Sequence, residues 1–280
     1  MQSKEIIGQW SESAPYWEKY RAVIVEMFAP VAQALIEDAA ITTGDAVLDV
    51  ATGPGEPALT IVDVVGPEGM VVGTDVAPEM VEAARREVAR NKLRNVRFEV
   101  AFTDALPFSA NLFDAVVSRF GVMFFPSPVD CLREMLRVLK PGGRIALAVW
   151  YAAERNPFDS MVSRVVDRYS EPGPPKPGST DMFRFAKPGD LMAVLANAGA
   201  SAASERVLRF SIRARLSAEE FWTLRSEMSE KLRSRLAPLS NSQREALQRD
   251  AIDAIRAYSV EDRISIPAEV LIVSGRKPSA

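Results

Sequence analysis

The apolar positions in the first 150 residues form short continuous runs, separated by stretches in which apolar residues recur at helical spacing. The first two runs are Ala46–Ala51 and Met70–Gly73, and three further strands are expected at Val96–Ala101, Phe113–Ser118 and Arg144–Trp150. A short apolar run is typical of a strand that is buried on both faces of a parallel sheet. Three helices are expected between the strands. The first ends near Val65, the second runs from Pro78 to Arg90, and the third covers residues 129–139 and is followed by Pro141-Gly142-Gly143. This alternation predicts βαβ units, and therefore an α/β fold with a doubly wound, mostly parallel sheet.

The alternation becomes looser after Trp150. The elements expected there are a stiff proline-rich loop over 171–178, a helix over 187–198, a sixth strand over 204–213 and a last strand over 267–275. With these two strands, the expected sheet has seven strands. The stretch 217–258 is charged and favours helix, so we expect a helical insertion that caps the site before the chain returns to the sheet.

The N-terminal part is expected to be helical, because apolar residues from Val23 through Ile36 follow helical spacing within residues 15–38. The pattern divides the chain into an N-terminal helical segment (1–43), a core (44–150) and the rest of the sheet with its cap (151–280). A length of 280 residues allows one large α/β domain with such an addition.

Composition narrows the classes of function. The net charge of -3 disfavours nucleic acid as the main partner, because phosphate contacts need clustered basic residues. The single cysteine, Cys131, cannot form an internal disulfide, so we expect a cytoplasmic protein. The polar segment Met1–Trp10 does not resemble a signal peptide, and no apolar run is long enough to span a membrane. The sequence has no histidine, which removes the commonest general base and metal ligand.

The segment VLDVATGPGEPAL, from Val47 to Leu59, places a glycine-rich turn after the first strand. Gly53, Gly55 and Ala58 also satisfy the dinucleotide pattern, and Asp75 lies where an acid accepts hydrogen bonds from ribose. Two prolines in the turn remove N–H groups that a pyrophosphate needs, and Asp49 and Glu56 add negative charge there. The turn therefore suits a phosphate-free cation better than a dinucleotide.

Five ordered motifs resemble those of the class I S-adenosylmethionine-dependent methyltransferases, in the branch related to ubiquinone and menaquinone C-methyltransferases. The motifs are VLDVATGPG, GTDVAPEMVEAAR, FTDALPF, FDAVVSRFGVMFF and LREMLRVLKPGGRIAL, within residues 44–150. The resemblance implies a Rossmann-like core that binds S-adenosylmethionine. This sequence has Ala51 and Thr52 where the first family motif often has glycine or cysteine, a departure expected to alter packing more than binding.

The resemblance also implies roles for residues at the matching positions. Asp75 would hold the ribose hydroxyls, Val76 and Met80 would pack on the adenine, and Asp104 would accept from its amino group. The remaining cofactor-binding candidates are Asp49, Ala51, Thr52, Gly53, Gly55, Thr103, Ala105, Ser118, Arg119, Phe120, Tyr16 and Tyr20. For the two tyrosines, packing of an N-terminal helix onto the sheet is the alternative interpretation.

The acceptor side is expected to be apolar. Met123, Phe124, Phe125 and Trp222 are candidates for lining it, with core packing as the alternative for each. An activated methyl donor needs mainly alignment, and the sequence identifies no catalytic base. The segment after the fourth strand, SRFGVMFFPSP, has neither the Asn/Asp-Pro-Pro-Tyr/Phe motif of amide and DNA-base N-methyltransferases nor the carboxylates of metal-dependent catechol-type enzymes. We therefore expect a small-molecule acceptor and no metal.

Two alternatives stay open at this point. One is a nicotinamide-dependent oxidoreductase or epimerase, which the acids and prolines of the turn disfavour. The other is a non-catalytic module that binds S-adenosylmethionine. The sequence also leaves both a monomer and a homodimer open.

Overall fold

The computed structural model describes residues 2–170, 181–261 and 263–279. Its helices and strands, in chain order, are α1 (Gln2–Lys19), α2 (Arg21–Asp38), β1 (Ala46–Val50), α3 (Ala58–Val65), β2 (Met70–Asp75), α4 (Pro78–Asn91), β3 (Val96–Val100), β4 (Phe113–Arg119), η1 (Val122–Phe124), α5 (Pro128–Val138), β5 (Leu139–Trp150), η2 (Ala153–Arg155), α6 (Pro157–Val166), α7 (Asp190–Asn197), β6 (Ser201–Ala214), α8 (Ala218–Met228), α9 (Glu230–Leu236), α10 (Asn241–Arg256), β7 (Ser259–Val260) and β8 (Arg263–Arg276).

The sheet has the strand order β3-β2-β1-β4-β5-β8-β6. The first five strands of this order run parallel, and β8 runs antiparallel between β5 and β6. The order reverses direction between β1 and β4, which is where open α/β sheets bind their ligands, at the carboxyl ends of the strands. The expected doubly wound α/β fold is confirmed, and the two-residue β7 adds a short eighth strand beside β8.

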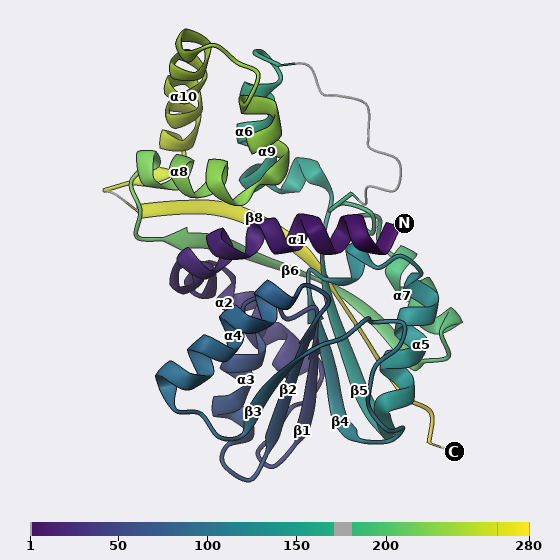
Figure 1. Cartoon of the computed structure of the whole chain (residues 1–280). Coiled ribbons are helices and arrows are strands. Elements are labelled where there is room, and N and C mark those ends of the chain that lie inside the picture. The colour runs from purple at the N-terminus through teal and green to yellow at the C-terminus, as the bar shows by residue number, and fades with distance from the viewer. Residues whose placement is uncertain (1, 171–180, 262, 280) are drawn as a thin grey trace.

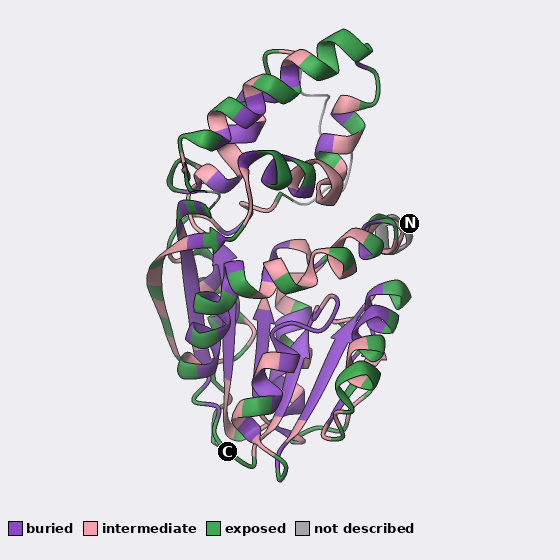
Figure 2. Cartoon of the chain, turned by 90° about the vertical axis from the view of Figure 1, so that its left-hand side faces the viewer, coloured by how far each residue is buried: buried purple, intermediate pink, exposed green. Residues whose placement is uncertain are grey.

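The apolar runs form the centre of the molecule. Figure 2 shows the parallel strands buried along most of their length, while the helices alternate between buried and exposed positions. The strands β1, β4 and β5 contribute fully covered residues such as Leu48, Val116 and Leu147. A strand covered by helices on both faces needs apolar side chains at every position, which is why the sequence shows runs there.

The N-terminal region differs from the prediction. Instead of one helix over 15–38, it forms α1 and α2, which are separated at Tyr20 (φ -99°, ψ 10°). The apolar residues of α2 pack into the core, whereas α1 lies across the carboxyl ends of the strands, as Figure 1 shows. There Trp10 contacts Phe124, and Ala14 packs with Ala77 and Met80. A segment that crosses an edge of the sheet does not need the long apolar stripe by which α2 was found.

Other boundaries also shift. The helix α6 was not predicted; β5 begins at Leu139 rather than Arg144, and β8 begins at Arg263 rather than Pro267. The early start of β5 follows from the pair Phe113–Leu139 and the register shift after it. The proline-rich loop predicted over 171–178 lies outside the described residues.

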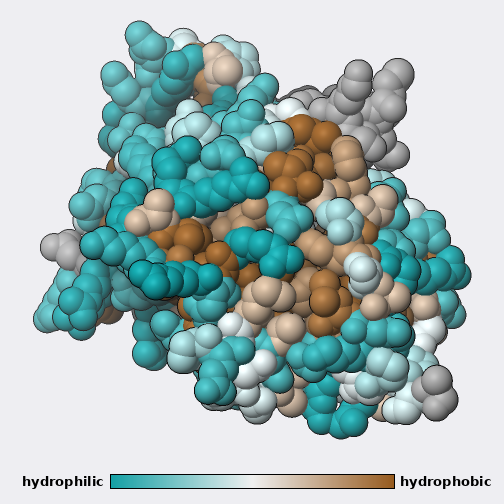
Figure 3. Space-filling model, turned by 60° about the horizontal axis from the view of Figure 1, so that its bottom comes forward, coloured by the Kyte–Doolittle hydropathy of each residue, from teal (hydrophilic) through white to brown (hydrophobic). Residues whose placement is uncertain are grey.

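The predicted helical insertion is present as α8, α9 and α10, which lie between β6 and β8 in the chain and stand above the sheet in Figure 1. Each of the three begins at a serine whose hydroxyl accepts from a backbone N–H: Ser217, Ser229 and Ser240. Such caps satisfy the free donors of the first turn. In Figure 3 this protruding part, at the upper left, is mostly hydrophilic, whereas hydrophobic residues gather in the middle of the face shown.

Candidate functional site

The glycine-rich turn after β1 bends sharply because several of its residues have positive φ. Ala51 (58°), Gly53 (57°) and Gly55 (105°) all do, and a side chain at Gly55 would also collide with Leu59. The Thr52 N–H donates to the Thr74 carbonyl at 2.9 Å, which ties the turn to β2. Only Ala51 and Gly53 of the turn are partly exposed, so a ligand can approach the backbone closely at these two residues.

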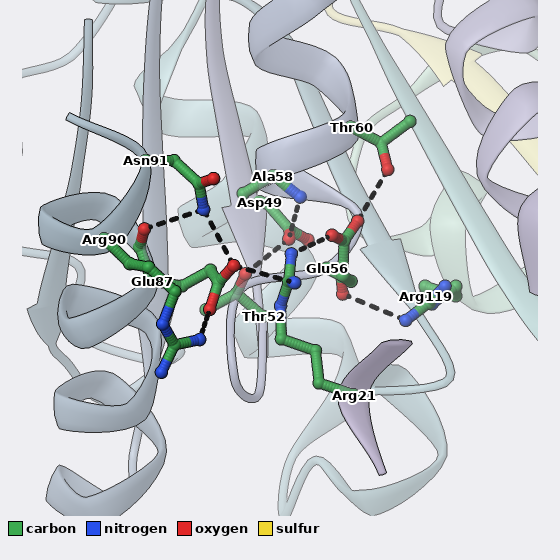
Figure 4. Close-up of polar contacts among 10 residues, drawn as sticks. All are labelled: Arg21, Asp49, Thr52, Glu56, Ala58, Thr60, Glu87, Arg90, Asn91 and Arg119. Carbon is green, nitrogen blue, oxygen red and sulfur yellow. Dashed lines mark hydrogen bonds and ion pairs between the residues drawn. The ribbon is translucent and has the colours of Figure 1, made fainter. Parts of the chain in front are cut away.

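Asp49, on β1, is fully buried beneath this turn. Its Oδ2 accepts from the Thr52 hydroxyl at 2.6 Å and from the Ala58 N–H at 3.0 Å, as Figure 4 shows. Its Oδ1 is buried and has no partner among the described residues. Burial raises the pKa of the Asp49 carboxyl to about 7, against the opposing effects of the Thr52 hydrogen bond and the Arg119 charge. A buried acceptor without a donor is a feature that a bound cation can satisfy.

Glu56, in the same turn, forms a second buried acidic position. It accepts from Arg21 Nη2 at 2.6 Å and from the Thr60 hydroxyl at 2.6 Å. Arg21 also lies 3.3 Å from Glu87 on α4, so the first residue of α2 bridges the turn and α4 (Figure 4). This ion pair compensates the Glu56 charge and holds the start of α2 against the site.

Asp75, at the end of β2, is 8% exposed. Its Oδ2 accepts from the Gly53 N–H at 2.9 Å and its Oδ1 from the Ala77 N–H at 3.0 Å. Burial raises the pKa of Asp75, while these backbone hydrogen bonds oppose the shift. Since an ionised carboxylate has about four acceptor sites, Asp75 can hold the turn and still accept two hydroxyl protons. Met80 is buried nearby on α4, and Val76 is partly exposed.

The end of β4 meets the glycine-rich turn directly. A Cβ at Gly121 would lie 2.7 Å from the Ser118 hydroxyl and would clash with Ala51, so only glycine fits between the two loops. The Ser118 hydroxyl is buried without a hydrogen-bond partner among the described residues. Arg119 donates to the Glu56 carbonyl at 3.4 Å. The structure therefore brings the predicted residues of β1 and β4 together.

Phe120 follows Arg119 with φ 61°, which is rare for an aromatic residue and costs on the order of 1 kcal/mol. Its ring stacks on Trp150 at 4.7 Å between centroids, and Trp150 stacks on Phe158 at 5.9 Å. Phe28 of α2 meets all three rings edge-on. Backbone strain of this kind is concentrated at functional sites, and here it turns an aromatic ring toward an aromatic cluster.

The other predicted site residues are distributed between the core, the contact with Trp10 and the segment after β3. Met123, Phe125 and Trp222 are buried in the core, and Phe124 is partly exposed and contacts Trp10. Thr103, Asp104 and Ala105 follow β3; Asp104 and Ala105 are exposed, and the Ala105 N–H donates to the Phe102 carbonyl at 3.2 Å.

The two tyrosines of the N-terminal region contact the cap. The Tyr20 hydroxyl donates to Glu227 on α8 at 2.7 Å, and the Arg233 guanidinium of α9 lies 4.7 Å from the centre of the Tyr16 ring. Lys19 also pairs with Glu227, at 2.6 Å. The structure thus places these side chains between the N-terminal helices and the cap; their predicted contact with a cofactor stays a prediction.

The Tyr20→Phe variant is expected to lower the free energy of unfolding by about 1 kcal/mol, because it removes one hydrogen bond to a charged group while Lys19 still pairs with Glu227. Urea unfolding of the two proteins measures this difference. The Tyr258→Phe variant is a matched control, because the Tyr258 hydroxyl makes no hydrogen bond with a residue that the structure describes. A change as large in the control as in Tyr20→Phe would contradict the assignment.

Two features are absent from the part of the chain that the structure describes. No helix there combines the length and hydropathy that a membrane crossing requires. No three acidic or cysteine side chains gather there in a way that could hold a metal ion.

The fold and this edge define the class of protein: a Rossmann-like core with acids and glycines at the ends of β1 and β2, as in class I S-adenosylmethionine-dependent methyltransferases. A family model described as "Methyltransferase domain" matches residues 41–197, more than half of the chain. The chain belongs to this methyltransferase family, and its cofactor is S-adenosylmethionine.

The relatives agree with this assignment. The chain is 36% identical over 143 residues to the aklanonic acid methyltransferase DauC of Streptomyces sp. (strain C5), covering 51% of this chain and 64% of DauC. It is 38% identical over 136 residues to the ubiquinone/menaquinone biosynthesis C-methyltransferase UbiE of Pseudomonas fluorescens, covering 48% of this chain and 52% of UbiE. The match thus spans about half to two thirds of these relatives.

A solved structure supports the fold alone. The crystal structure of the YcgJ protein from Bacillus subtilis aligns with a TM-score of 0.55 and 21% sequence identity, covering 89% of this chain and 98% of YcgJ.

Three residues of the site were not predicted from the sequence: Arg21, Phe28 and Trp150. Trp150 had a usable signal, because it ends a predicted strand and ligands bind at carboxyl ends of strands. Arg21 and Phe28 had none, because their positions depend on how α2 docks against the sheet.

Proposed function

We propose that this chain transfers the methyl group of S-adenosylmethionine to a small, apolar or aromatic molecule. The observation that carries the proposal is Asp75, which holds the glycine-rich turn through Gly53 and keeps acceptor capacity beside it. The names of the relatives refer to an acid and to the biosynthesis of quinones. Their sequences are matched only in part, so the acceptor is inferred from the site.

The residues present fit the cofactor. The partnerless Asp49 Oδ1 favours an ammonium and a sulfonium over a phosphate. We assign Asp75 to the ribose hydroxyls, Val76 and Met80 to the adenine, and Asp104 to its amino group. The remaining proposed contacts are Asp49, Ala51, Thr52, Gly53, Gly55, Thr103, Ala105, Ser118 and Phe120, while Met123, Phe124, Phe125 and Trp222 are the weaker proposals for the acceptor. Arg119 is placed beside the reacting methyl, on the side of the acceptor.

The bound cofactor supplies a methyl group on a positively charged sulfur, which needs no further activation. The chain then has to align the acceptor and exclude water. Alignment of two reactants accounts for roughly 7–11 kcal/mol of a barrier. The backbone of the turn, locked by Asp75 and Thr52, is the rigid side of this arrangement, and the aromatic cluster at Phe120 and Trp150 is the apolar side.

Calorimetric titration of the purified chain with S-adenosylhomocysteine, with NAD as the comparison ligand, tests the proposal. We expect micromolar binding of S-adenosylhomocysteine and none of NAD. The reverse result would favour the oxidoreductase alternative. A protein that binds S-adenosylhomocysteine but methylates no member of a panel of small acceptors would be the non-catalytic module.

Three finer statements stay predictions: a division at residues 43 and 150 with the cap over 217–258, a cytoplasmic location, and a homodimer as an alternative to a monomer. The first is supported by the position of α8–α10 between two paired strands.

A further inference from the structure

Arg119 differs from the other arginines around the site in that it has no ion pair among the described residues. Arg21 pairs with Glu56 and Glu87, and Arg225 pairs with Asp159 at 3.2 Å. Arg119, at the carboxyl end of β4, makes one long hydrogen bond, 3.4 Å to the Glu56 carbonyl. A guanidinium has five N–H donors, so most of its capacity is unused.

The unused donors of Arg119 are not completely shielded from solvent. Arg119 is only partly exposed, yet its nitrogens are absent from the fully buried, partnerless atoms, which do include the Nε atoms of Arg21 and Arg225. Burial lowers the pKa of Arg119, and the Glu56 and Asp49 charges oppose that shift without contacting the guanidinium in an ion pair. An unpaired cation in such a place attracts an anion strongly.

The surroundings of Arg119 also select for an aromatic ligand. The guanidinium carbon lies 5.9 Å from the centre of the Phe28 ring. Phe28 is in edge-on contact with Phe120, Trp150 and Phe158, so the cation stands at the border of an aromatic cluster. Phe28, Trp150 and Phe158 are buried, whereas Phe120 is partly exposed, so the Phe120 ring is the part of the cluster that a planar ligand can contact. A ring that packs there can bring its acidic group to the guanidinium.

We propose that Arg119 binds an anionic oxygen of the methyl acceptor, and that the acceptor is an aromatic acid bound as a carboxylate or phenolate. This inference rests on the proposed function. An acceptor anion brings its own electron pair, which forms the new bond to the methyl carbon while the pair of the broken carbon–sulfur bond stays on sulfur. No proton has to be removed, which agrees with a site that has no histidine.

The test uses the full chain saturated with S-adenosylhomocysteine and titrated with 2-naphthoate or with the neutral 2-naphthamide. The wild type is expected to bind the acid at least tenfold more tightly than the amide. In Arg119→Met the acid is expected to bind no better than the amide, while affinity for S-adenosylhomocysteine changes less than threefold. Arg119→Lys, which keeps the charge, should retain part of the preference. Arg133→Met, which removes one exposed positive charge from α5, should retain all of it.

Three results would overturn the proposal. The first is a wild type that does not bind the acid or binds acid and amide equally, a comparison that needs no variant to fold. The second is an unchanged preference in Arg119→Met. The third is a tenfold loss of S-adenosylhomocysteine affinity in that variant, which would assign the guanidinium to the carboxylate of the cofactor. A wild type that fails to bind S-adenosylhomocysteine would instead reject the proposed function, before any probe is added.

Discussion

Asp75→Ala is expected to lower the affinity for S-adenosylhomocysteine by more than tenfold. The substitution removes the proposed partner of the ribose hydroxyls and also frees the N–H groups of Gly53 and Ala77, which Asp75 holds at 2.9 and 3.0 Å. Hydrogen bonds to a charged group contribute about 1.5–3 kcal/mol, which corresponds to roughly 10- to 100-fold in affinity. Calorimetric titration of wild type and variant measures the change.

Asp63→Ala is the matched control for this experiment, since Asp63 is an exposed residue of α3 and loses the same charge. Its affinity should equal that of the wild type. Because Asp75→Ala also loosens the turn, urea unfolding without ligand should accompany the titration. A variant that folds and binds within twofold of the wild type would rule out the ribose contact.

The free energy of unfolding of the wild type is expected to fall as the pH rises, because of Asp49. The Asp49→Asn variant is expected not to show this fall. The pKa of Asp49 is about 7 in the folded protein and near its ordinary value of 3.8 when unfolded. The folded state therefore holds this proton more tightly, and the Asp49 contribution to stability is full below pH 4 and falls until about pH 7. Between pH 5 and pH 8 the loss is about 2–3 kcal/mol, from about 1.4 kcal/mol per pKa unit.

Asparagine is a suitable replacement because its oxygen can accept from Thr52 and Ala58, while its amide takes the place of the partnerless Oδ1. The measurement is urea unfolding of both proteins at pH 5 and pH 8. Other groups titrate in both proteins alike, so only the difference between the two pH dependences reports on Asp49. Parallel pH dependences would show that Asp49 is ionised in the fold throughout.

The parts of the fold that could be predicted from sequence are those in which one physical signal dominates. The strands β1, β2, β4 and β5 are buried along most of their length on both faces, so their apolar composition marks them, whereas the edge strand β3 is marked by alternating apolar and charged residues. Most of the helix α1 was missed because the majority of its residues are polar and Pro15 stands inside it, whereas α2 is rich in apolar residues. The contacts of α1 are shared among α4, η1 and the cap. The early start of β8 was missed because Pro267 reads as a strand boundary, whereas β8 accommodates it within its pairing with β6.

The residues of the site also fall into a group that the sequence predicts and a group that it does not. Asp49 and Asp75 lie at the carboxyl ends of β1 and β2, the glycines follow β1, and the strand pattern alone places them together. The pairs Arg21–Glu56 and Tyr20–Glu227 join residues that are distant in the chain. Their formation depends on the packing of α2 and α8, which no local pattern encodes. The sequence likewise contains no signal that Met123 and Phe125 are enclosed in the core.

The ladder between β6 and β8 ends with Ala214 opposite Ile264, so the chain leaves the sheet for the cap and returns to it at neighbouring positions. Insertions whose ends meet in this way disturb the host little. The helices α8–α10, the proposed cap, can therefore be exchanged, lengthened or shortened by recombination while the strands β1 and β2 keep their places in the sheet. The architecture separates a replaceable helical unit from the sheet that carries the proposed cofactor contacts, and a chimera that carries a relative's insertion on this sheet is the natural engineering use of that separation.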